Sequence, residues 1–115
     1  MKIAIATKDN WKRVSGHAGQ THEWLVFTCL PGEPIPQPVE VQLSKEQLPH
    51  HFQGDGPHPL HGVEIMVAGS AGDGYIRHMK KWGAEVLLTA ESDPQEALHM
   101  ILSGEILPEI RGGSV

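Results

Sequence analysis

The chain has 115 residues, of which 39% are hydrophobic and 20% are charged, a composition typical of one globular domain rather than a disordered or fibrous chain. Its formal net charge is −5 and its nine Lys and Arg residues are scattered. This argues against a nucleic-acid-binding protein, which would neutralise phosphates with clustered cations. The single cysteine, Cys29, excludes an internal disulfide and any all-cysteine metal site within one chain.

The first half of the sequence predicts three strands and no membrane segment. The apolar stretch in MKIAIATKDN is too short for a signal peptide or a membrane span, so we expect a cytoplasmic protein. Residues 2–7 form a run typical of a buried strand, and residues 8–21 are expected to be a loop. Residues 23–29 and 39–43 are the next two strands, and the prolines between them exclude regular structure there.

The second half predicts a strand, helix, strand unit and a closing helix. Strands are expected at residues 63–69 and 84–90, and the intervening helix carries Tyr75, Met79 and Trp82 on one face. The two strands should be parallel, joined by a right-handed crossover. The closing helix begins with Asp93 as its N-cap, and Glu96 is placed to complete a variant of the capping box.

This order of elements predicts a single-domain α/β fold with a mixed five-stranded sheet. Following the strand directions along the chain brings three segments to one edge of that sheet: residues 8–22, residues 44 to about 54, and the turn from Gly69 to Gly74. In open α/β sheets, ligands bind at the edge where the parallel strands have their carboxyl ends. We therefore expect a binding site there.

Histidines are concentrated in the segments that reach this edge. His17 lies between glycines in VSGHAG, and residues 50–61 read HHFQGDGPHPLH. His50 and His51 are adjacent, so in extended chain they point in opposite directions and only one is expected to assist His17. His58 and His61 lead away towards the next strand. A metal site and a solvated, imidazole-rich loop both stay open on this evidence.

The AGSAGDG turn, residues 68–74, is a second candidate site. It lies between a strand and a helix, where exposed backbone N–H groups can hold an anion, and its candidate binding residues are Gly69 and Gly72. No Gly-Lys-Ser/Thr follows, and the glycine order of the dinucleotide fingerprint is absent. A tight turn in which glycine serves geometry alone is the alternative.

The residue types do not indicate an enzyme. Cys29 has no histidine near it in sequence, so we expect a buried, inert thiol. The two-metal site of a nuclease would need acids that converge at one edge, whereas Glu64 begins its strand at the opposite end. Trp11 could line a ligand pocket, although packing is its simplest role. A hydrolase with histidine as its general base is a weaker third possibility.

Four motifs in order, MKIAIAT, VSGHAG, VAGSAGDGY and WGAEV, resemble the dinitrogenase iron-molybdenum cofactor biosynthesis family over residues 1–105. The last residues, 106–115, are expected to form a flexible tail. The resemblance implies a ribonuclease H-like fold without nuclease activity. It also implies an accessory protein of nitrogen fixation that binds the iron-molybdenum cofactor, its precursor or a related metal–sulfur (iron–sulfur) cluster without catalysing a reaction.

The resemblance also implies the site residues and the partners. His17 would be the principal ligand, with His50 or His51 assisting, and the turn from Gly69 to Gly74 matches the family's glycine turn. Ala18 stands where the family typically has an aromatic residue, which would open the pocket or remove a packing contact. Partners would be cofactor-assembly or nitrogenase proteins, and a homodimer could cover the sheet face that the short histidine segment leaves exposed. A metal-free regulatory domain that binds a small molecule or anion is the alternative.

Overall fold

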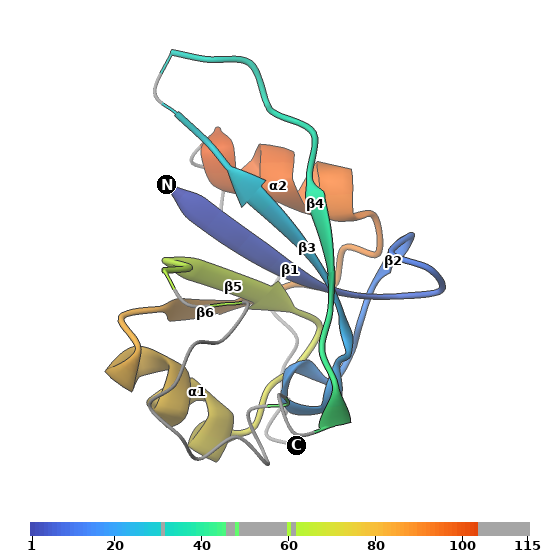
Figure 1. Cartoon of the computed structure of the whole chain (residues 1–115), viewed down its shortest axis with the longest axis vertical. Coiled ribbons are helices and arrows are strands. Elements are labelled where there is room, and N and C mark those ends of the chain that lie inside the picture. Colours follow the sequence, from blue (N-terminus) through green and yellow to red (C-terminus); the bar gives the residue numbers. More distant parts are fainter. Residues whose placement is uncertain (31, 46–47, 49–59, 61, 104–115) are drawn as a thin grey trace.

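A mixed β-sheet forms the middle layer of the molecule (Figure 1), in a computed structural model that describes residues 1–30, 32–45, 48, 60 and 62–103. Its strand order is β4-β3-β1-β5-β6. Pairing is antiparallel from β4 through β3 to β1, and parallel from β1 through β5 to β6. This confirms the predicted fold. The strands are β1 (Lys2–Lys8), β3 (Glu23–Thr28), β4 (Val39–Gln42), β5 (Ile65–Ala68) and β6 (Glu85–Leu88).

The segment after β1 has more structure than the sequence predicted. A two-residue strand, β2 (Arg13–Val14), pairs antiparallel with the end of β1, and a 3-10 helix, η1 (Ala18–Gln20), follows. The chain reverses through three consecutive left-handed residues, Asp9, Asn10 and Trp11, with φ of 55°, 60° and 64°. The prediction of a loop was wrong for β2 and η1, because non-glycine residues rarely adopt this conformation and no sequence pattern indicates it.

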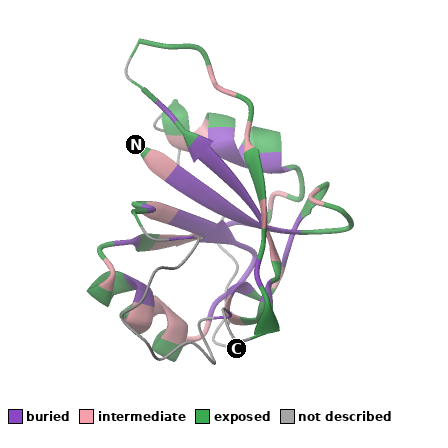
Figure 2. Cartoon of the chain, viewed as in Figure 1, coloured by how far each residue is buried: buried purple, intermediate pink, exposed green. Residues whose placement is uncertain are grey.

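The core lies on both faces of the sheet, between the sheet and one helix on each side (Figures 1 and 2). Because β1 is central, its side chains are buried alternately on the two faces. Ala4 and Ala6 join the cluster on the side of helix α1 (Asp73–Lys81), whereas Ile3 and Ile5 join the cluster on the side of helix α2 (Pro94–Leu102). Trp24 is the largest fully buried side chain.

The helix ends follow local rules, with one exception. Gly83 adopts a φ of 82° directly after α1, as a C-terminal glycine should. Asp93 caps α2 by accepting a hydrogen bond from the Gln95 N–H at 2.9 Å. The predicted capping box was wrong, because Glu96 was expected to accept the Asp93 N–H. That N–H donates instead to Glu91 Oε1 at 3.0 Å.

Several predictions concern residues that the structure does not describe. Within residues 46–61 the structure describes Leu48 and Leu60, which are buried in the cluster on the α1 side and help to cover that face of the sheet. None of the helices in the described ranges has the length and apolar character needed to cross a bilayer. The following lie outside the described residues: His50, His51, His58, His61 and the tail at 106–115.

Candidate functional site

Two loops that are far apart in sequence meet at the carboxyl edge of the parallel strands. The Gly69 N–H donates to the Ser15 carbonyl at 2.8 Å, and the Ala18 N–H donates to the Ser70 carbonyl at 3.1 Å. Ser70 Oγ also donates to the carbonyl of Gly16. The convergence predicted for residues 8–22 and the Gly69–Gly74 turn is therefore confirmed.

A cavity of about 470 Å³ lies beside this junction. One wall is formed by residues 17–20, and the other by residues 70–72 together with the first turns of α1. A water molecule occupies roughly 30 Å³ in the liquid, so the cavity has room for a polyatomic ligand. The lining residues are His17, Ala18, Gly19, Gln20, Ser70, Ala71, Gly72, Gly74, Tyr75 and His78.

His17 presents a free ring from a fixed backbone. Its N–H donates to Ser15 Oγ at 3.3 Å, and its carbonyl accepts the Thr21 hydroxyl at 2.6 Å. The side chain is exposed and lines the cavity. A metal ligand benefits from a fixed main chain and an accessible imidazole, because the loop then loses little conformational entropy on binding.

The two glycines predicted to bind a ligand have different positions. Gly72 lines the cavity and is the N-cap of α1, where no side chain caps the helix. Gly69 is buried behind the cavity wall, and its N–H is already bonded to Ser15. A Cβ at Gly69 would lie 3.0 Å from Gly16 Cα. Gly69 is therefore required for the close approach of the loops, while Gly72 is accessible to a ligand.

Helix α1 contributes two side chains that sequence reasoning did not place in a site. The Tyr75 hydroxyl donates to Met66 Sδ at 3.4 Å, and burial raises the pKa of this phenol, so Tyr75 is neutral at physiological pH. His78 lines the cavity, its ring lies 5.1 Å from that of Trp82, and its Nε2 is buried without a hydrogen-bond partner. Nothing in the sequence distinguishes His78 from a surface residue of an amphipathic helix.

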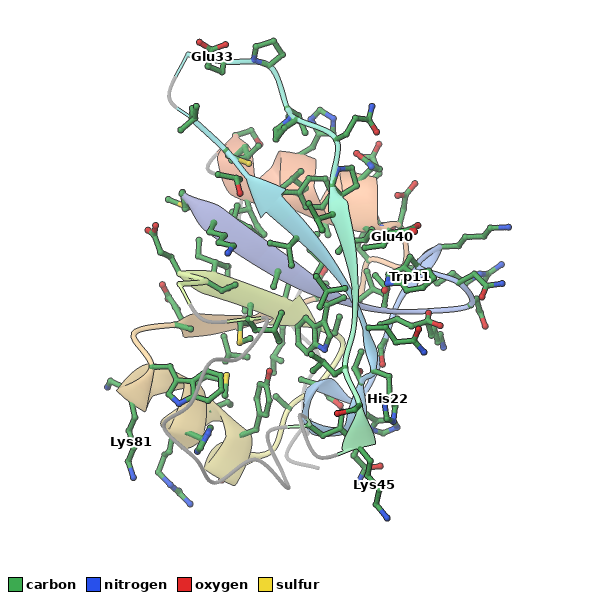
Figure 3. All side chains as sticks on the ribbon, viewed as in Figure 1. Trp11, His22, Glu33, Glu40, Lys45 and Lys81 are labelled. Atoms are coloured by element: carbon green, nitrogen blue, oxygen red, sulfur yellow. The ribbon has the colours of Figure 1, made fainter. Side chains whose placement is uncertain are left out.

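Trp11 and His22, both labelled in Figure 3, are not among the residues that line the cavity. The Trp11 indole donates to the Val41 carbonyl at 3.3 Å, and the ring packs on the cluster on the α2 side. The suggestion that Trp11 lines the pocket was wrong, because the left-handed turn directs it to the other face of the sheet. His22 Nδ1 lies 2.8 Å from the Leu43 carbonyl, which occupies this nitrogen.

Glu23 and Glu64 lie at opposite ends of the sheet and do not converge on one site. Glu23 pairs with Thr7 near the end of β1, whereas the Glu64 N–H donates to the Lys2 carbonyl at its start. In the described ranges, no group of three or more His, Cys, Asp or Glu side chains could hold a metal ion. Cys29 is buried in the cluster on the α2 side, as predicted.

The fold and the site define a class: small α/β domains with a cavity at the carboxyl edge of a mixed sheet. A comparison with protein families then identifies the particular family. The sequence model described as "Dinitrogenase iron-molybdenum cofactor" matches residues 1–104, so the chain belongs to that family. No curated protein matches the chain significantly.

Solved structures share the fold at low sequence identity. The crystal structure of PH0822 superposes with a TM-score of 0.76 at 18% identity and covers 96% of this chain and 97% of its own. A candidate dinitrogenase protein from Methanocaldococcus jannaschii gives 0.71 at 14%, covering 96% and 95%. The apo form of the orange protein from Desulfovibrio gigas gives 0.66 at 15%, covering 96% and 93%. At such identities the likeness establishes the fold alone.

Proposed function

We propose that this protein binds and carries an iron-molybdenum cofactor, its precursor or a related metal–sulfur cluster, and catalyses no reaction on it. The observation that carries the proposal is the cavity of about 470 Å³, which has the exposed imidazole of His17 on one wall and the uncapped start of α1 on the other. Family membership supports the same cargo.

The donor set of the cavity fits a preassembled cluster. Such a cluster brings its own sulfides, so a carrier needs few protein ligands. His17 offers a nitrogen lone pair to a metal atom, and the backbone N–H groups that begin α1 can donate to sulfide. Among the described residues that line the cavity, the only His, Cys, Asp or Glu side chains are His17 and His78, and two imidazoles suit a cluster better than a single ion.

His50 and His51 remain proposed as assisting ligands, and Gly69 with Gly72 as the turn that shapes the site. We propose that cofactor-assembly or nitrogenase proteins deliver and accept the cluster, and that the protein can act as a homodimer. Double substitution of His50 and His51 by Ala should weaken cluster binding less than loss of His17, as measured by molybdenum retained after gel filtration.

The decisive experiment uses isolated iron-molybdenum cofactor added under anaerobic conditions to protein purified without an affinity tag. We expect molybdenum and iron to co-elute with the wild type and to be largely lost from His17→Ala. His99→Ala is the matched control, because His99 is exposed on α2, on the other face of the sheet. Equal retention by His17→Ala would remove the ligand assignment, and no retention by the wild type would remove the function.

The metal-free alternative rests on one observation, the uncapped N-terminus of α1 at Gly72. An anionic small molecule could bind there, although Asp73 already places a carboxylate in the first turn. Elemental analysis and absorption spectroscopy of anaerobically purified protein separate the two functions. Protein that lacks iron and molybdenum, yet carries an organic anion, would favour the alternative.

A further inference from the structure

His78 is the one described side chain with a buried polar atom that has no partner. Its Nε2 makes no hydrogen bond, although the ring is only half-buried and lines the cavity. Native structures pair almost all such atoms, so an unpaired ring nitrogen needs an explanation. The position of this ring, on the wall opposite His17, provides one.

The surroundings of His78 leave the ring free to turn towards the cavity. Helical side chains lean towards the N-terminus, so His78 reaches over Gly74, one turn earlier. An ideal Cβ at Gly74 has no atom of the described residues within 4 Å, so none of them fills this space. On the other side, Trp82 supports the ring at 5.1 Å with a tilt of 55°. A half-turn about the Cβ–Cγ bond exchanges Nε2 with Cε1, and this torsion is soft.

We infer that His78 is the second imidazole of the binding cavity and that it holds the bound cluster from α1 while His17 holds it from the η1 loop. The inference rests on the proposed function and adds the point of attachment on the helix wall. In the protein without cargo, the His78 nitrogen is unsatisfied. On binding, the ring turns and the nitrogen pairs with the cluster, either by ligating a metal atom or by donating its N–H to a sulfide.

The two-wall arrangement also sets the kind of cargo. A single ion would need a group of at least three ligands, and the described residues contain none. Cargo that carries several sulfides can instead accept hydrogen bonds from both imidazoles within a cavity of about 470 Å³. The proposed cargo is therefore a metal–sulfur species with sulfides to offer to both rings.

The test uses tetrathiomolybdate, a diamagnetic molybdenum–sulfur anion, as the probe. Histidine-labelled wild-type protein is titrated while the ring nitrogen resonances are followed by NMR. We expect the His17 and His78 signals to shift together and the His99 signal to stay. His78→Phe keeps an aromatic ring against Trp82 but removes both nitrogens, and should bind the probe about ten-fold more weakly while remaining at least as resistant to urea as the wild type.

The outcomes separate this inference from the proposed function. If the His78 signal does not move while His17 and cluster binding are intact, the inference fails and the proposed function stands. The inference also fails, and the proposed function stands, if folded His78→Phe binds the probe as tightly as the wild type while His17→Ala does not. If the wild type binds neither tetrathiomolybdate nor iron-molybdenum cofactor, the proposed function fails as well.

Discussion

Substitution of Gly69 by Ala tests the closest contact in the site. The new Cβ would lie 3.0 Å from Gly16 Cα and 3.2 Å from the Ser15 carbonyl oxygen. Both atoms belong to backbone that three hydrogen bonds hold in place, so neither can move aside alone. The loops must separate, and the bonds between them must lengthen.

The expected loss combines two effects. Forcing one methyl into a packed contact costs about 1–3 kcal/mol, and weakening two buried hydrogen bonds adds roughly 1 kcal/mol. We therefore expect Gly69→Ala to lower the free energy of unfolding by about 2–4 kcal/mol. Urea unfolding followed by tryptophan fluorescence measures this, because Trp24 is fully buried in the core.

Gly74→Ala is the matched control. Its Cβ meets nothing within 4 Å, and alanine is the better helix former by up to about 1 kcal/mol, so this variant should be as stable as the wild type or more so. The reasoning is refuted if Gly69→Ala unfolds within about 0.5 kcal/mol of the wild type, since the loops would then tolerate a side chain at their closest point.

Other parts of the fold give further expectations. Asp93→Ala should lower stability by about 1 kcal/mol through the lost N-cap of α2, with Gln95→Ala as a near-neutral control, measured by urea unfolding. Burial raises the pKa of the only tyrosine, Tyr75, above its ordinary value of 10.0. The contribution of the neutral, buried phenol to folding stability is therefore complete below the ordinary pKa and is lost as the pH rises through the raised pKa. Tyrosinate absorbance should therefore appear together with alkaline unfolding; its appearance in the folded protein would contradict this. Arg13→Ala should change stability by less than about 0.5 kcal/mol, because its 3.9 Å pair with Asp9 is exposed, and thermal melts in low and high salt check this.

The fold could be predicted from the sequence because every residue of the central strands is of a type found in buried strands. Ile3 and Ile5 alternate with Ala4 and Ala6, and the chain order of strands and helices then leaves one sheet topology. The left-handed turn that directs Trp11 away from the cavity could not be predicted, since it depends on tertiary contacts that stabilise an unfavourable backbone.

The candidate site could be predicted in part. The strand directions indicated which loops share an edge of the sheet, and His17 stood out between two glycines. His78 was missed because a histidine inside an amphipathic helix looks like any surface residue until the neighbouring loop is in place. Gly69 and Gly72 look equivalent in sequence, and their different roles depend on which N–H already has a backbone partner.

The junction of the two loops has a consequence for the order of events during synthesis. Gly16 and Ser70, which it joins, are 54 residues apart, so the ribosome completes His17 long before the opposite wall of the cavity exists. A domain that folds from its N-terminus cannot close this cavity until β5 has emerged and paired with β1 and α1 has formed after it. Under the proposed function, loading is thereby confined to finished molecules, and cargo that contacts both loops stabilises only the completed fold.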